Sequence, residues 1–220
     1  MLIKLLITLL PWPIRRILLQ KCYGYTIHPS AKIGLAWIFP KKLVMFPNSK
    51  IDHFTIAINL DYMKLESNAS IGRSNWITGF PTKSTSGHFV HQPDRNAELI
   101  LGESSAITKK HHLDCTNAIH IGKFSTIAGY DSQLLTHSIN VLENIQDSAP
   151  IVIADYTFVG TNSVILGGSI LPSYSVLGAK SLLNKPFENE WKLYAGVPAK
   201  QINDIPKTAK YFSRTEGFVF

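Results

Sequence analysis

Aliphatic residues recur at every sixth position through the second half of the chain. The longest run is Ile153, Val159, Ile165, Leu171, Leu177 and Leu183. The fifth position of each hexapeptide is often small or hydroxylated, as at Thr157, Ser163, Ser169, Ser175 and Ser181. The same phase appears upstream at Leu65, Ile71 and Ile77, at Leu101, Ile107 and Leu113, and, displaced by two residues, at Ile121 and Ile127. Weaker turns at Ile27 and Ile33 begin the series.

A period of six fits neither an α-helix of 3.6 residues per turn nor a hairpin of alternating polarity. It fits a solenoid in which each hexapeptide forms a short strand and a corner. The recurring aliphatic residues then stack inside, and small residues occupy the tight corners. The pattern therefore predicts an all-β fold, a parallel β-helix.

Two segments interrupt the period, and interruptions of a solenoid commonly carry function. Residues 80–98, FPTKSTSGHFVHQPDRNAE, are polar, contain Pro and Gly, and include two histidines. Residues 139–150, INVLENIQDSAP, directly follow THS at 136–138. We expect both to be loops inserted into the β-helix.

The N-terminal residues 1–25 differ from the repeat. An apolar run from Leu2 to Leu10 is stopped by Pro-Trp-Pro at 11–13, too short to span a bilayer and unlike a signal-peptide cleavage site. Beyond it, Ile14, Ile17 and Leu18 alternate with Arg15, Arg16 and Lys21 as in a basic amphipathic helix. This helix is expected either to bind a membrane surface or to cap the core. The expected organisation is thus 1–25, a β-helix over 26–190, and a C-terminal extension, a short tail or helix, over 191–220.

Charge is concentrated at the N-terminal end. The net charge is +7, yet residues 1–50 contain eight Lys/Arg and no Asp or Glu, which leaves the rest of the chain close to neutral. A basic end predicts contact with an anionic surface such as a membrane. It does not predict the extended positive groove of a nucleic-acid-binding protein. Cys22 and Cys115 form no C-x-x-C pair, and we expect free thiols in a reducing compartment.

Three stretches carry a resemblance to a known family. They are IGKFSTIAGYDSQLLTHS (121–138), IADYTFVGTNSVILGGSILPSYSVLGAKSLLNK (153–185) and YAGVPAKQI (194–202). The chain resembles the hexapeptide-repeat acyltransferases, and more closely their sugar O-acetyltransferase branch. The resemblance implies a left-handed parallel β-helix with three hexapeptides per coil, here preceded by the N-terminal amphipathic helix.

Acetyl transfer to a hydroxyl requires a base, because an alcohol attacks a thioester slowly until its proton is removed. His137, in LLTHSIN, matches the position of the family's catalytic histidine, so the resemblance implies that it is the general base. His111 and His112 lie one coil earlier and are expected to contact the substrate, with Asp114 orienting one of them. The alternative for all three is a set of solvated corner residues.

The resemblance also implies acetyl-CoA as the acetyl donor, without a metal. Backbone amides at small corner residues are expected to hydrogen-bond the pantetheine arm, and lysines to contact the phosphates. The candidate residues are Gly160, Thr161, Gly178, Ala179, Lys180, Lys185 and Lys200. In the family the CoA site lies between subunits, which implies a homotrimer.

The expected function is transfer of acetyl from acetyl-CoA to a saccharide or lipid-linked glycan during surface polysaccharide biosynthesis. The expected location is the cytoplasm, at the inner face of the membrane, with no nucleic-acid partner. Two alternatives stay open. A γ-class carbonic anhydrase shares the β-helix but needs three histidines converging on zinc, and no histidine set here follows that spacing. The other alternative is a non-catalytic β-helix scaffold.

Overall fold

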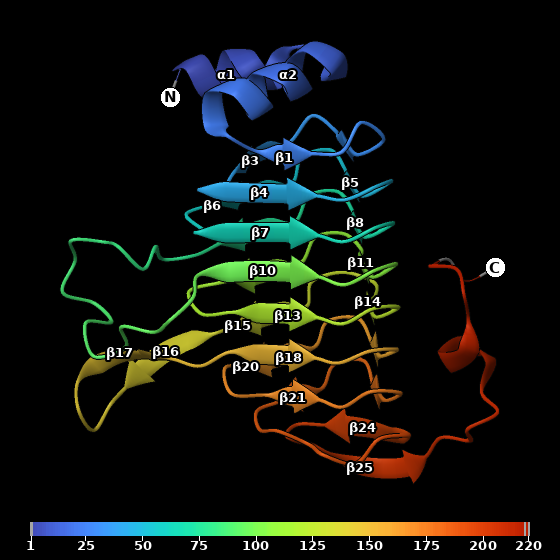
Figure 1. Ribbon diagram of the computed structural model, residues 1–220. Coiled ribbons are helices and arrows are strands. Elements are labelled where there is room, and N and C mark those ends of the chain that lie inside the picture. The colour runs from blue at the N-terminus through green and yellow to red at the C-terminus, as the bar shows by residue number, and fades with distance from the viewer. Residues whose placement is uncertain (1, 218, 220) are drawn as a thin grey trace.

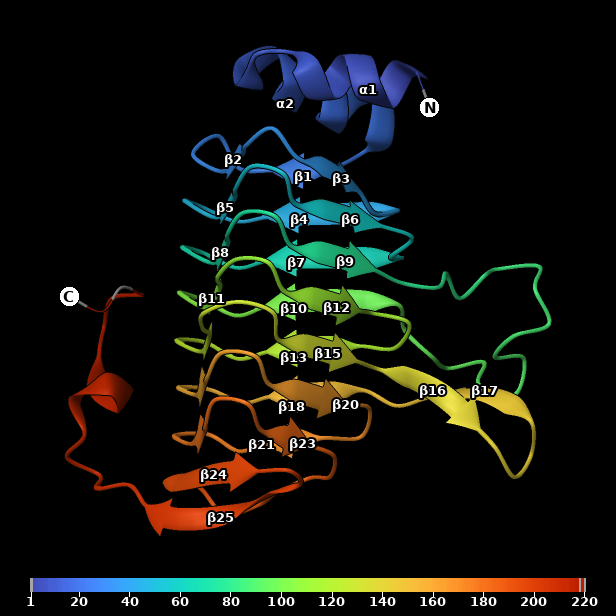
Figure 2. The same ribbon diagram turned by 180° about the vertical axis from the view of Figure 1, so that it is seen from behind.

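The computed structural model, which describes residues 2–217 and 219, has two helices at one end of a parallel β-helix and a hairpin at the other (Figures 1 and 2). The first sheet contains β1 (Thr26–Ile27), β4 (Lys42–Met45), β7 (Tyr62–Leu65), β10 (Glu98–Leu101), β13 (Ile119–Ile121), β18 (Ile151–Ile153) and β21 (Ile170–Leu171). The second contains β2 (Lys32–Ile33), β5 (Lys50–Ile51), β8 (Ser70–Ile71), β11 (Ala106–Ile107), β14 (Thr126–Ile127), β19 (Phe158–Val159) and β22 (Val176–Leu177). The third contains β3 (Trp37–Phe39), β6 (Ile56–Ile58), β9 (Trp76–Thr78), β12 (His112–Asp114), β15 (Gln133–Leu135), β20 (Val164–Leu166) and β23 (Leu182–Leu183).

The six-residue period corresponds to the buried core. Every residue of the series from Ile153 to Leu183 has no exposed surface, and its neighbours in the next coil are the equivalent residues. The displacement by two residues at Ile121 arises because Ile121 pairs with Leu101, 20 residues earlier, whereas Leu171 pairs with Ile153 after 18 residues, so this coil is two residues longer. The hydroxylated fifth positions are buried as well, and Ser163 Oγ donates to the Gly160 carbonyl at 3.0 Å. The small hydroxylated residues therefore fit into the tight corners and hydrogen-bond backbone carbonyls there.

A regular coil fills the gap that the sequence pattern leaves between Ile33 and Leu65. β4, β5 and β6 form a complete coil in register with the coil that follows. Its inward positions are Met45, Ile51 and Ala57, all at most 1% exposed. Methionine and alanine replace branched aliphatic residues at two of the three positions, and this hides the repeat from a search for Ile, Leu and Val.

The N-terminal segment forms α1 (Leu2–Leu9) and α2 (Trp12–Tyr23), which lie across the first coil (Figures 1 and 2). Leu19 of α2 enters the core, so the helix caps the β-helix. The predicted separation of faces is wrong: Arg15 is buried, 5% exposed, whereas Ile14 and Ile17 are 51% and 47% exposed, on the same face as the exposed Lys21. The Arg15 guanidinium donates to the backbone carbonyls of Thr8, Ile33 and Gly34. Capping an open coil edge requires such donors, which an aliphatic side chain lacks.

The opposite end is closed by β24 (Lys192–Gly196) and β25 (Ala199–Asp204), an antiparallel hairpin that pairs with β22. A short 3₁₀ helix, η1 (Lys210–Ser213), follows and runs back along the solenoid (Figure 1). Phe212 of η1 packs against Tyr174 and Trp191, which are stacked at 4.6 Å between ring centroids. These aromatic rings fix the C-terminal segment against the corner between the first and second sheets.

Candidate active site

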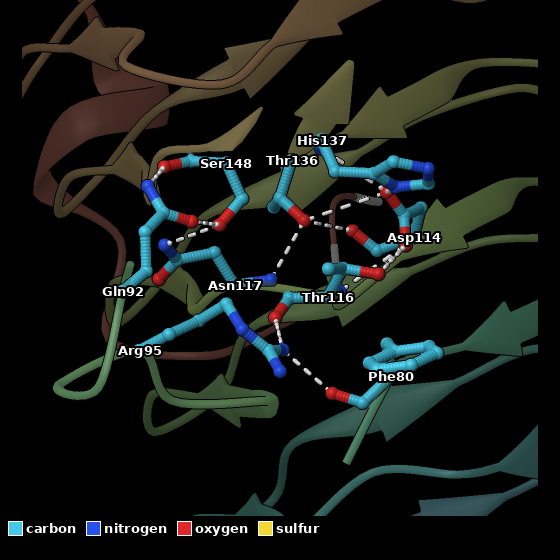
Figure 3. A network of polar contacts seen from close by, with 9 residues as sticks. All are labelled: Phe80, Gln92, Arg95, Asp114, Thr116, Asn117, Thr136, His137 and Ser148. Carbon is cyan, nitrogen blue, oxygen red and sulfur yellow. Dashed lines mark hydrogen bonds and ion pairs between the residues drawn. The ribbon is translucent and has the colours of Figure 1, made fainter. Parts of the chain in front are cut away.

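His137 stands where the chain leaves the solenoid. β15 ends at Leu135, and β16 (His137–Asn140) begins a hairpin with β17 (Ile145–Ser148) that projects from the body (Figure 2). One coil earlier, Asp114 ends β12 and pairs in register with Leu135. This stacking places the Asp114 carboxylate directly beside the His137 ring (Figure 3).

The Asp114 carboxylate is held on both oxygens. Oδ2 accepts hydrogen bonds from His137 Nδ1 and from the His137 backbone N–H, the latter at 3.2 Å. Oδ1 accepts from the Thr116 N–H at 3.1 Å and from Thr116 Oγ1 at 2.7 Å. The Thr136 hydroxyl donates to the Asp114 backbone carbonyl at 2.7 Å. These contacts fix the orientation of the imidazole.

The two pKa shifts agree with an ionised carboxylate beside a basic imidazole. Burial opposes ionisation of Asp114, but hydrogen bonds from His137 and Thr116 outweigh it and hold the pKa of the carboxyl below its ordinary value. The hydrogen bond to Asp114 raises the pKa of His137, opposed by burial and by the charge of Arg95. In neutral His137, Nδ1 carries the proton that points at Asp114, which leaves the lone pair on Nε2. Nε2 forms no hydrogen bond within the described residues, and the side chain is 41% exposed.

The two predicted loops meet beside His137. Gln92 Nε2 donates to the Ser148 carbonyl at 2.9 Å, and Ser148 Oγ donates back to Gln92 at 2.7 Å (Figure 3). Gln92 Nε2 also donates to Asp147 Oδ1 at 2.7 Å. Phe89 lies edge-on to the His137 ring, 6.1 Å between centroids. Together the loops enclose a cavity of about 330 Å³, lined by Gly87, His88, Phe89, His91, Ile139, Asn144, Ile145 and Gln146. This cavity is the candidate acceptor pocket.

Arg95 is a site residue that the sequence does not reveal. Its side chain is buried, 6% exposed, and donates to the Phe80 carbonyl at 2.6 Å and to the Thr116 carbonyl. Its guanidinium also lies 4.6 Å from the Phe89 ring centroid. Arg95 thereby ties the first loop to Thr116, the residue that holds Asp114. An arginine within a polar loop carries no pattern that would mark it.

His111 and His112, which are also predicted to contact the acceptor, do not lie beside His137. His111 is 1% exposed, Nδ1 accepts from the Ser132 N–H at 3.1 Å, and Nε2 lies 2.9 Å from Thr108 Oγ1. Burial lowers the pKa of His111 to about 4. His112 is exposed on the outer face of β12. The expectation that Asp114 orients His111 or His112 is corrected, because Asp114 stands at the other end of β12 and bonds His137.

Five of the predicted cofactor residues lie before third-sheet strands, at the strand ends opposite to His137. Gly160 and Thr161 stand at the corner before β20, and Gly178, Ala179 and Lys180 stand at the same corner one coil later. The N–H groups of Gly160 and Gly178 are engaged with the next coil, at 2.8 Å each, so the expectation that they serve a ligand is corrected. The N–H groups of Thr161 and Ala179 form no hydrogen bond within the described residues.

The glycines are explained by coil stacking. A Cβ on Gly160 would lie 2.5 Å from the Ala179 nitrogen, and one on Gly178 would lie 2.9 Å from Ala195 Cβ. Lys200 is opposite Ala195 in the β24–β25 hairpin, which places it near this corner together with Lys180. Lys185 lies beyond β23, at a different corner, with its ammonium 5.5 Å from the Phe187 ring centroid.

Other parts of the structure lie away from these two corners. A cavity of about 1150 Å³ runs between the outer face of the second sheet and the C-terminal segment, away from His137. Over the residues described, no three His, Cys, Asp or Glu side chains come together as a set that could hold a metal ion. Cys22 is exposed and Cys115 is buried, and both are free thiols.

Comparisons with known proteins identify the fold. No protein-family model and no curated protein sequence matches the chain. Among solved structures, the polysialic acid O-acetyltransferase OatWY is similar at 15% identity, with 87% of this chain and 90% of that chain covered and a TM-score of 0.59. A hexapeptide-repeat containing acetyltransferase from Vibrio cholerae O1 biovar eltor, complexed with acetyl coenzyme A, is similar at 18% identity over 93% of this chain and 84% of its own, with a TM-score of 0.51. The fold is therefore the left-handed parallel β-helix of hexapeptide-repeat proteins, as the sequence predicts.

Proposed function

We propose that this protein is an acyltransferase that moves an acetyl group from acetyl-CoA to a sugar hydroxyl, with His137 as the general base. The observation that carries the proposal is the Asp114–His137 pair, beside Phe89, which lines the pocket formed by the two inserted loops. The similar structures support this activity, since one was crystallised with acetyl-CoA and another is a polysialic acid O-acetyltransferase.

The chemistry follows from the orientation of the imidazole. The acceptor hydroxyl oxygen attacks the thioester carbonyl carbon while His137 Nε2 removes the hydroxyl proton. Asp114 stabilises the resulting imidazolium through Nδ1–H. The tetrahedral intermediate then collapses, the C–S bond breaks, and the Nε2 proton passes to the leaving sulfur, which gives the acetyl ester and free CoA.

The acetyl donor fits the corner formed by Thr161 and Ala179. Their two N–H groups, which have no hydrogen-bond partner among the described residues, lie in successive coils and can hydrogen-bond the amide carbonyls of an extended pantetheine arm. Lys180 and Lys200 supply cations for the phosphates at the same corner. Because acetyl-CoA is made in the cytoplasm, we place the enzyme there, and its acceptor among the glycans assembled for the cell surface.

This arrangement supports a homotrimer with shared active sites. Within one chain, His137 and the Thr161 corner stand at opposite ends of the third-sheet strands. A neighbouring subunit related by a threefold axis can bring its Thr161 corner to the His137 of the first. Mixing His137→Ala subunits with Lys200→Glu subunits, at an acetyl-CoA concentration too low to load the Lys200→Glu variant, should restore activity if the site is shared. Without restoration, the shared site is wrong.

The decisive test of the function is His137→Ala, measured as acceptor-dependent release of the CoA thiol with a panel of oligosaccharides. Transfer should fall by about 10² to 10⁴, while acetyl-CoA affinity and the circular dichroism spectrum stay unchanged. His120→Ala is the matched control, because His120 also pairs with a carboxylate, Glu98 at 2.8 Å, but on the outer face of the first sheet. Near wild-type transfer by the His137 variant would disprove the proposal.

The acceptor itself can be identified in cells. Mass spectrometry of the surface glycan, with and without the gene, should show loss of acetyl groups from the repeating unit. Complementation with the His120→Ala variant should restore them, whereas complementation with His137→Ala should not. An unchanged glycan in the deletion strain would point to a different acceptor.

A further inference from the structure

The N-terminal helices carry an exposed apolar surface that the β-helix does not use. We call it the helical face, and it comprises Leu2, Ile3, Leu5, Leu6, Leu9, Ile14 and Ile17, each at least 47% exposed. From this face and its surrounding charge we infer that α1 and α2 dock the protein onto an anionic lipid bilayer. The inference is independent of the proposed acetyl transfer.

The pattern along α1 separates its two sides. Only Ile7 and Thr8 are buried, and they lie on the side that meets the rest of the protein. With 100° between successive helical residues, the five exposed residues of α1 form one continuous stripe on the opposite side. That stripe contains no polar side chain. A contiguous exposed apolar patch of this kind marks an interaction surface.

The second helix extends the same surface and adds charge. Ile14, Ile17 and Lys21 have the i, i+3, i+7 spacing of one helical face, and all three are exposed. The helices are attached firmly, because the buried Arg15 on the other side of α2 bonds carbonyls of α1 and of the first coil. The helical face therefore belongs to the folded body of the protein.

The geometry fits a helix lying in the plane of a membrane. α1 has eight residues, about 12 Å at 1.5 Å per residue, against a hydrocarbon core of about 30 Å. Across the described residues, no helix is both long enough and apolar enough to cross a bilayer. Leucines inserted at the boundary of headgroups and acyl chains, with cations among the headgroups, are typical of interfacial helices.

The charge on the helical face favours a lipid bilayer over a second copy of the chain as its binding partner. Residues 1–50 contain no acid, and Lys21 lies within the exposed stripe itself, whereas Arg15 is buried on the other side of α2. Two copies joined through this face would bring like charges together with no carboxylate to compensate them. Anionic lipid headgroups compensate the same charges. The hairpin tip is the contrasting case, because there the exposed Val141 and Leu142 are followed by Glu143.

The experiment is vesicle co-sedimentation of the purified full-length protein. Vesicles of phosphatidylcholine with phosphatidylglycerol should bind the wild type, and added salt should weaken binding. Replacing two exposed leucines in Leu2→Gln/Leu6→Gln should reduce binding by about 10-fold or more for each leucine. Lys21→Gln should reduce binding to the anionic vesicles about fivefold and leave binding to vesicles of phosphatidylcholine alone unchanged.

The control is Leu142→Gln, which removes a leucine that is 90% exposed at the hairpin tip and should leave binding unchanged. The inference is overturned if the wild type does not sediment with anionic vesicles, or if Leu142→Gln weakens binding as much as the helical variant does. It is also overturned if the helical variant lowers the molecular mass in lipid-free sedimentation, because the face then covers a second copy. Neither assay depends on acetyl transfer, so failure here leaves the proposed function standing.

Discussion

Replacing Asp114 by asparagine keeps the size of the side chain but removes the carboxylate oxygen that orients His137. Asparagine Oδ1 can still accept both hydrogen bonds from Thr116, as Asp114 Oδ1 does. Its Nδ2, however, replaces the oxygen that accepts from His137. An amide N–H facing the ring favours the tautomer with a lone pair on Nδ1 and the proton on Nε2. Nε2 then cannot act as a base, although the fold is preserved.

The magnitude follows from the role being removed. Loss of a positioned general base costs about 10² to 10⁴ in rate, and we expect Asp114→Asn to fall in this range in kcat. The wild-type rate should rise with pH through a pKa above the ordinary 6.5 of histidine, because the bond to Asp114 raises the pKa of His137. In the variant, whatever activity persists should rise at lower pH, since that bond is lost.

The assay is acceptor-dependent CoA thiol release across a pH series, with thermal unfolding measured alongside. Because the folded-state pKa of Asp114 is lowered, its carboxylate stabilises the fold above its unfolded pKa, and this contribution disappears as pH falls through the folded pKa. The variant should therefore melt lower at neutral pH and approach the wild type in acid. Asp131→Asn, an exposed carboxylate with φ of 57°, is the control. An Asp114→Asn enzyme with wild-type kcat and an unshifted pH profile would refute the orienting role.

Three other substitutions test separate parts of the structure. Arg95→Met should move the acid limb of the rate profile to higher pH, because the charge of Arg95 lowers the pKa of His137. The substitution should also cost about 1 to 3 kcal/mol of stability, because it leaves buried carbonyls without a donor. An acid limb that moves to lower pH would contradict this prediction. Lys200→Glu should weaken acetyl-CoA binding in calorimetry, with a smaller loss at high salt, and unchanged affinity removes Lys200 from the site. Gly160→Ala should destabilise the fold by about 1 to 3 kcal/mol in denaturant titrations, because its Cβ would lie 2.5 Å from the Ala179 nitrogen; wild-type stability would mean that the coils can separate there.

The sequence by itself determined the solenoid, its core and the position of its loops. A coil contacts mainly the coils above and below it, so each inward position is selected by the same local environment and the period is written along the chain. For this reason Val159, Ile165 and Leu171 could be placed inside without knowing any long-range contact. The resemblance of LLTHSIN to a family motif then selected His137.

Only the tertiary structure decided which groups serve His137 and which do not. Asp114 and His137 are 23 residues apart, and the loops meet through Gln92 and Ser148, 56 residues apart. The period tells which coil each residue occupies, but the direction of a side chain at a corner depends on how the next coil stacks there. The same dependence explains the burial of Arg15, because the unpaired carbonyls that it bonds exist only where the stack of coils ends.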